Sequence, residues 1–158
     1  DGEADDTVRD LAYSAGLCHN LGLMAFAHLE PSRTSAVLAE HRKQALPDTL
    51  SDMLIDEFET DHKIMTARLG AIWSLPPAMV SAFESRIAEN ADCDDRLGCI
   101  LAAGVIAAEN SEVPEEGRKS LDDWARRLGI GSETMQEIAS VSERQRERIQ
   151  SLANNMVR

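Results

Sequence analysis

Residues 57–76 read EFETDHKIMTARLGAIWSLP, and this stretch carries the clearest local signals in the sequence. Asp61 suits the position before a helix, because an aspartate there accepts hydrogen bonds from the first free backbone amides. The residues that follow, as far as Trp73, favour helix and lack the alternating pattern of a strand. Pro76 and Pro77 then mark a boundary, where proline is tolerated. The stretch therefore predicts one helix, a short turn and the start of a second helix.

The same features extend along the whole chain. Aromatic residues make up only 4% of the sequence, and Ala, Leu, Glu, Arg and Met dominate it. These residues favour helices, and no alternating Val/Ile/Thr run of useful length occurs. We expect an all-α fold. The sequence predicts helices near residues 5–18, 21–29, 32–45, 49–58, 61–74, 76–89, 94–110, 119–128 and 133–156, with a loop at 111–118.

Length and charge bound the function. The 158 residues are 43% hydrophobic, which is enough for one domain with a real core. No stretch is long and apolar enough to span a membrane. The net charge of −12 disfavours binding to free nucleic acid. Acidic residues concentrate in residues 1–62 and basic ones in 126–158. This pattern indicates either ordinary solvated helix faces, or oppositely charged ends of the chain that dock on each other or on a partner.

The cysteines argue against a metal or disulfide scaffold. Cys18, Cys93 and Cys99 are odd in number and have no C-x-x-C spacing, so neither a zinc site nor a disulfide framework is expected. We interpret them as small apolar side chains in a reducing, cytoplasmic protein. No phosphate-binding or dinucleotide-binding glycine motif occurs, nor does a serine nucleophile motif, and we expect no cofactor.

Two histidines are the candidate site residues. His19 is followed by Asn20, whose neutral amide is a weak metal ligand, so packing at a helix junction between Gly16 and Gly22 is the favoured interpretation. His62 lies in the first turn of the helix that begins after Asp61, where a histidine is a ligand or, more often, polar surface. We expect Trp73 to fill core beside Leu75 and Pro76.

Two blocks resemble a known family. Residues 12–22, AYSAGLCHNLG, resemble the "GLLHDIG" signature of HD-type domains. Residues 57–76 look like the "E…DH…G..L…W.LP" block of the HDOD family, the HD-related output domain, and the order and spacing of both blocks fit. The resemblance covers about residues 12–83. It implies an HD-superfamily helical bundle from a bacterial signalling protein, without catalytic activity, although related HD and HD-GYP enzymes are metal-dependent phosphohydrolases.

The resemblance also implies a degenerate metal site. His19 matches the first metal-binding histidine of the enzymes and His62 a further one, but Asn20 stands in place of their aspartate. Their His-His pair falls at residues 86–87, which read Arg-Ile, and their later aspartate falls near residues 103–104, which read Ala-Gly. Two histidines without a carboxylate hold Mg²⁺ or Mn²⁺ poorly. We therefore expect a vestigial HD site at His19, Asn20 and His62, with no bound metal and no catalytic residue.

These observations favour a non-catalytic regulatory domain that acts by binding another signalling protein or domain. A metal-dependent phosphohydrolase acting on a nucleotide or cyclic dinucleotide, with carboxylates from Asp56, Glu57 or Asp61, is the first alternative. A small-ligand sensor that uses the old metal cleft is the second. We expect no nucleic-acid or membrane partner and leave a homodimer open. We expect one helical domain over residues 1–158 that resembles the C-terminal part of an HDOD domain, whose usual N-terminal helices are missing or belong to another part of a longer protein.

Overall fold

The computed structural model describes residues 2–44, 49–86 and 96–109, together with scattered residues between 126 and 151. Contacts within the chain define two compact units, residues 1–101 and 102–158, and each is described by itself. The organisation as a single domain remains a prediction.

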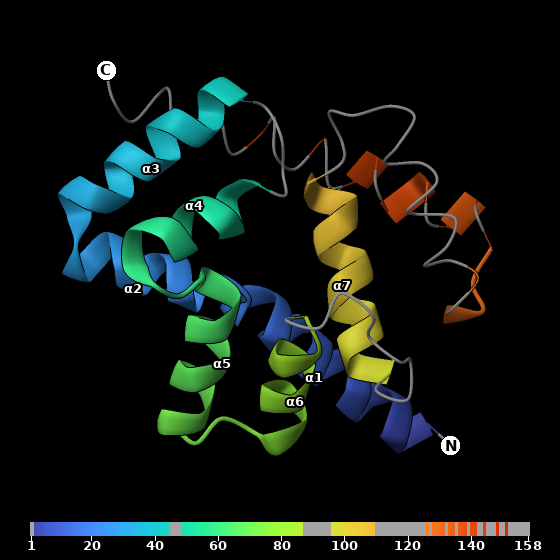
Figure 1. The fold of residues 1–158 in the computed structure, drawn as a ribbon. Coiled ribbons are helices and arrows are strands. Elements are labelled where there is room, and N and C mark those ends of the chain that lie inside the picture. Colours follow the sequence, from blue (N-terminus) through green and yellow to red (C-terminus); the bar gives the residue numbers. More distant parts are fainter. Residues whose placement is uncertain are drawn as a thin grey trace. The chain divides into compact units, whose positions relative to one another are not determined.

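The described elements are all helices, so the predicted all-α fold class is confirmed (Figure 1). No strand occurs among the described residues. The predicted loop at 111–118 lies outside them, as does most of the predicted helices near 119–128 and 133–156. No described helix has both the length and the apolar character that crossing a lipid bilayer requires. The helices are α1 (Gly2–Cys18), α2 (Leu21–Leu29), α3 (Pro31–Gln44), α4 (Thr49–Phe58), α5 (His62–Ile72), α6 (Pro77–Ser85) and α7 (Arg96–Glu109).

Helix α5 is central to residues 1–101, because it packs against both α2 and α6. Helix α3 packs against α2 and α4, and α1 contacts α6. Phe26, Val37 and Leu54, from α2, α3 and α4, form one buried cluster. Phe83 of α6 is also fully buried and lies against Gly70 of α5. Burial of these side chains is the main force that holds short helices together, since isolated helices of 9 to 14 residues are marginal in water.

A clamp joins α3 to the end of α4. The Nε of Arg33 donates to Glu57 Oε1 at 2.6 Å, and its Nη2 donates to the Glu57 carbonyl at 2.5 Å. The guanidinium lies 4.7 Å from the centre of the Phe58 ring, within the range of a cation–π contact. Phe58 in turn stacks on Phe26, with ring centres 4.7 Å apart. The clamp therefore connects a surface ion pair to the buried cluster.

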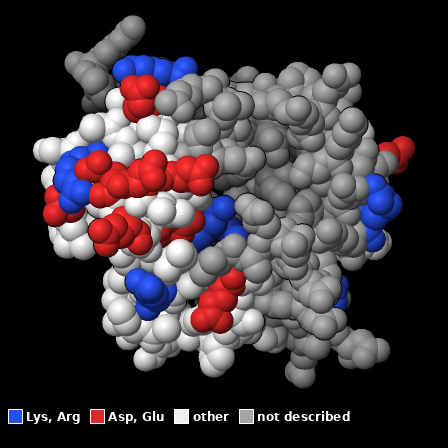
Figure 2. Space-filling model, viewed as in Figure 1, with Lys and Arg blue, Asp and Glu red and all other residues white. Residues whose placement is uncertain are grey.

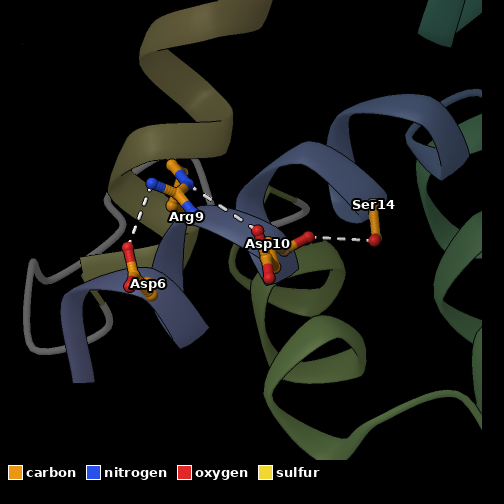
Figure 3. Close-up of polar contacts among 4 residues, drawn as sticks. All are labelled: Asp6, Arg9, Asp10 and Ser14. Carbon is orange, nitrogen blue, oxygen red and sulfur yellow. Dashed lines mark hydrogen bonds and ion pairs between the residues drawn. The ribbon is translucent and has the colours of Figure 1, made fainter. Parts of the chain in front are cut away.

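The outer face of α1 is a solvated surface with local polar contacts (Figure 3). Arg9 lies 3.0 Å from an Asp6 oxygen and 3.7 Å from an Asp10 oxygen, and the Ser14 hydroxyl donates to the Asp10 carbonyl. All four side chains are exposed. Exposed pairs of this kind add little stability, so they mark this face as surface rather than interior.

A Schellman motif closes α5. The Ser74 amide donates to the Ala71 carbonyl at 3.1 Å, and the Leu75 amide donates to the Gly70 carbonyl at 3.0 Å. Ser74 has a φ of 55°, in the left-handed region that glycine usually occupies in this motif. The turn therefore ends the helix sharply at Trp73, with a serine in a conformation that favours glycine.

Two expectations about single side chains are wrong. Trp73 is 57% exposed and does not fill the core, because the buried positions at this end are occupied by Gly70, Met79 and Phe83. Cys99 is buried and disulfide-bonded, so it is more than a small apolar side chain. Cys18 is a free thiol, as expected.

Candidate functional site

His19 lies in the two-residue turn between α1 and α2 and is half-buried. Its Nδ1 lies 2.5 Å from the Gly16 carbonyl oxygen, one helical turn earlier. A carbonyl only accepts hydrogen bonds, so Nδ1 carries a proton and donates to it. The histidine is thus packed at the helix junction, as predicted, with its ring orientation set by the end of α1.

Asn20 precedes α2 in the N-cap position, but its side chain makes no capping hydrogen bond. Its backbone carbonyl accepts the Met24 amide at 3.1 Å, which begins the hydrogen-bond pattern of α2. Asn20, which the resemblance aligns with an aspartate of the enzymes, therefore begins α2 through its backbone.

The helices α2 and α5 touch backbone to backbone at Gly22. The Gly22 amide donates to Thr66 Oγ1 at 2.9 Å, and the Thr66 hydroxyl donates to the His62 carbonyl at 2.8 Å, one turn back in α5. A Cβ at Gly22 would lie only 2.1 Å from the His62 carbonyl oxygen. Only glycine allows this approach, which brings the His19 turn against the first turn of α5.

His62 is the first residue of α5 and is only 6% exposed, so it is not the polar surface side chain that is usual in a first helical turn. Asp61 caps the helix as predicted, with Oδ1 accepting the Ile64 amide at 2.7 Å. The pKa of His62 is lowered to about 4, chiefly by burial and in smaller part by the charge of Arg86, against the opposing effect of Asp61. His62 is therefore neutral at pH 7, and its buried Nδ1 has no hydrogen-bond partner.

Arg86, directly after α6, completes this group of residues. Its Nη1 donates to the His19 carbonyl at 3.1 Å, and its charge acts on His62. The structure thus brings together three segments that are far apart in the sequence, at residues 19, 62 and 86. A guanidinium, which keeps its positive charge at any ordinary pH, lies among them.

The carboxylates proposed as extra ligands have other roles. Asp61 caps α5, and Glu57 pairs with Arg33. Asp56 is an exposed side chain of α4. Within the part of the chain that the structure describes, no three His, Cys, Asp or Glu side chains are grouped closely enough to hold a metal ion. The donor set around His19 and His62 therefore does not fit a divalent cation.

The family model of the HDOD domain matches residues 2–87. The chain belongs to the HDOD family. No curated protein and no solved structure matches the chain. The HDOD match runs from α1 to the residue after Arg86, so it includes His19, Asn20, His62 and Arg86. The resemblance seen in the two sequence blocks is confirmed, and its extent is greater toward the N-terminus than residues 12–83.

Three contributors to this HDOD site are not predicted by the sequence. Thr66 lies one turn after His62, where its hydroxyl can reach backbone groups of both α5 and α2. Gly22 lies three residues after His19, and its role as a contact point shows only when α5 is placed against it. Arg86 stands out in the sequence only as a departure from the histidines of the enzymes, because its hydrogen bond to the His19 carbonyl depends on where α6 ends.

Proposed function

We propose that this HDOD domain is a non-catalytic output domain of a bacterial signalling protein, which acts by binding another protein or domain. The observation that carries the proposal is the position of Arg86. Its guanidinium is hydrogen-bonded to the His19 carbonyl and acts electrostatically on His62. A fixed positive charge repels a divalent cation at short range, so it takes the place of a metal instead of supporting one.

The histidines support the same conclusion. A hydrolytic metal centre needs several ligands and an open position for an activated water. His19 offers Nε2, but His62 is buried at the start of α5, against the backbone of α2. The neutral Asn20 side chain supplies no charge to balance a cation. We therefore assign the residues around His19 and His62 a structural role: they connect the α1–α2 turn to α5 and to the end of α6.

The alternative with a specific observation in its favour is a small-ligand sensor. The buried Nδ1 of His62 has no partner, and a ligand that supplied one would remove the cost of leaving that atom unpaired. Such a ligand would stabilise the folded chain and raise its melting temperature. A thermal-shift screen with nucleotides and cyclic dinucleotides tests this alternative directly.

The proposed function is tested by metal content and hydrolysis. Protein purified without an affinity tag is analysed by mass spectrometry before and after incubation with Mn²⁺ and Fe²⁺, and is assayed with bis-p-nitrophenyl phosphate and cyclic di-GMP. We expect no stoichiometric metal and no hydrolysis. Bound metal that is lost in His19→Ala, or hydrolysis that is lost in His62→Ala, would overturn the proposal.

A variant designed to gain metal binding serves as the positive control for the expected absence of bound metal. The double variant Asn20→Asp, Arg86→His removes the guanidinium and restores a carboxylate and an imidazole beside His19. We expect it to bind Mn²⁺ more tightly than the unaltered chain, with Arg86→Gln alone as the control for the lost charge. Equal Mn²⁺ binding by all three proteins would contradict the assignment of these positions to one site.

A further inference from the structure

The segment from Leu69 to Phe83 contains no charged residue, although the whole chain has a net charge of −12. It includes the end of α5, the turn and most of α6. Its exposed apolar positions are Ala71, Ile72, Trp73, Pro76, Pro77 and Ala78. We call these six residues the α5–α6 corner. Ile72 is 73% exposed and Trp73 is 57% exposed, so two large apolar side chains face solvent side by side in the sequence.

Large exposed apolar side chains also occur on α1, α2 and α4, and the stretch from Leu11 to Leu29, like the corner, contains no Asp, Glu, Lys or Arg. They are Tyr13, Leu17, Met24, Leu29 and Ile55. Tyr13 and Leu17, on α1, share their helix face with the charged residues Arg9 and Asp10. Ile55, on α4, lies between Asp52 and Asp56. Single exposed apolar residues are normal on a protein surface, whereas Ile72 and Trp73 are two consecutive large apolar side chains, and apolar side chains exposed together indicate an interaction site.

On one face of the molecule, charge is distributed unevenly between α3–α4 and α5–α6 (Figure 2). Acidic side chains gather over the part of this face formed by α3 and α4, whereas α5 and α6 show a basic and an acidic patch above an uncharged lower tip. Tryptophan is among the side chains most often found at the energetic centre of protein interfaces.

The corner is rigid before any partner binds. The amides of Trp73, Ser74 and Leu75 are all hydrogen-bonded to carbonyls of α5. Beneath the turn, a Cβ at Gly70 would lie 3.3 Å from the Phe83 ring, so α5 and α6 are tightly packed there. Ser74 is held at a φ of 55°, a conformation that a non-glycine residue keeps only where the surroundings impose it. A surface fixed in this way loses little conformational entropy on binding.

We propose that the α5–α6 corner docks into an apolar pocket on a basic partner protein, with the Trp73 side chain as its anchor. The inference rests on the proposed function and names the surface that performs it. The partner is basic because a chain of net charge −12 attracts a positively charged protein over distance. The pocket is apolar because the corner offers no charge with which a buried ion could pair.

A second copy of the chain fits the corner less well. Two copies repel each other, since each carries a charge of −12. The exposed parts of Ile72 and Trp73 together amount to about 200–300 Å², below the roughly 800 Å² that each partner contributes to a stable interface, so with any partner the corner supplies only part of the contact. An anionic membrane is disfavoured for the same electrostatic reason. The corner is thus suited to anchor a larger interface whose remaining contacts are polar.

The test places a photo-crosslinking amino acid, p-benzoylphenylalanine, at position 73 of the full chain in the cells that produce it. Position 13 is the matched control, because Tyr13 is 70% exposed and aromatic. The protein crosslinked at position 73 is identified, purified and titrated against the unaltered chain, Trp73→Ser, Ile72→Ser and Tyr13→Ser. We expect a basic partner whose affinity falls by about 30-fold or more in Trp73→Ser, as for a hot-spot residue, and by less than about threefold in Tyr13→Ser. Its affinity should also weaken as salt is raised.

Each other outcome overturns the inference. Position 73 could crosslink only to a second copy of the chain, or to an acidic partner. The partner could also bind Trp73→Ser as tightly as it binds the unaltered chain. Blue-shifted Trp73 fluorescence with phosphatidylserine vesicles, without a protein crosslink, would assign the corner to membranes instead. A partner crosslinked at position 13 but not at position 73 would refute this surface and leave the proposed function intact. Metal-dependent hydrolysis would refute the proposed function, whichever position crosslinks.

Discussion

Replacing Gly22 by alanine is expected to disrupt the contact between α2 and α5. The added Cβ would lie 2.1 Å from the His62 carbonyl oxygen and 2.8 Å from the Thr66 nitrogen, whereas ordinary contacts begin near 3.4 Å. Both obstacles belong to the backbone of α5, so no side-chain rotation relieves them. The two helices must move apart by more than about 1 Å, which is a case of severe overpacking.

The expected loss of stability has three parts. Overpacking typically costs about 1–3 kcal/mol, and here the clash is with backbone. Separation of the helices also breaks the bond from the Gly22 amide to Thr66 Oγ1, and a buried group left unpaired costs about 1–3 kcal/mol. Alanine regains about 1 kcal/mol through its higher helix propensity. The net loss is about 3 kcal/mol, a large share of the roughly 5–15 kcal/mol that stabilises a typical domain.

Gly16→Ala is the matched control, because it adds the same methyl group within α1 where no atom lies within 4 Å. It is expected to raise the free energy of unfolding by about 0.5–1 kcal/mol. Gly70→Ala should fall between the two, since its Cβ would meet only the edge of the Phe83 ring, at 3.3 Å. Urea unfolding followed by far-UV circular dichroism measures all three variants. The reasoning would be refuted if Gly22→Ala lowered the free energy of unfolding by less than about 1 kcal/mol. It would also be refuted if Gly16→Ala lowered this free energy instead of raising it.

Three further predictions concern α5 and its two ends. The folded-state pKa of His62, about 4, is below its ordinary value of 6.5, so the unfolded chain binds the proton more tightly between these values. Protonation of His62 therefore leaves the free energy of unfolding unchanged above about pH 7 and lowers it increasingly as the pH falls toward 4. By pH 5 the free energy of unfolding is lower by about 2 kcal/mol. The urea midpoint should fall less between pH 7.5 and pH 5.0 in His62→Gln than in the unaltered chain. An equal fall in both proteins would contradict the burial of a neutral imidazole. Asp61→Ala should lower the free energy of unfolding by about 1 kcal/mol, while Asp61→Asn keeps most of the cap; if both variants unfold at the same urea concentration, the cap is not the cause. Ser74→Gly should raise it by about 0.5–1 kcal/mol by relieving the left-handed conformation, and a fall in melting temperature would show that the turn does not favour glycine.

The helical content and the ends of α5 could be predicted from local signals. Asp61 as a cap, and the prolines before α6, act through neighbouring residues in the sequence, so their effects could be inferred without the fold. The HDOD family was also predicted, through the resemblance of the two sequence blocks, and the family match confirms it, whereas the vestigial metal site at His19, Asn20 and His62 stays a prediction.

The burial of individual side chains could not be predicted in the same way. His62 is buried because Gly22 lets α2 approach its carbonyl, and that contact joins residues far apart in the sequence. Trp73 is exposed at the end of α5, where Ser74 adopts a left-handed conformation that the residue type does not favour. In both cases a contact or a backbone angle set by the tertiary structure overrides the preference of the residue itself.

The hydrogen bond from Arg86 to the His19 carbonyl has a consequence for how this fold is controlled. A metal ion that joined the same segments would have a free concentration, and chelation or starvation would then loosen the structure. The guanidinium is covalently part of the chain, so its local concentration is constant and set only by the freedom of the segment that carries it. The closure of the α1–α2 turn onto the end of α6 is therefore independent of the metal supply of the cell. Any signal that opens it must act on the polypeptide itself.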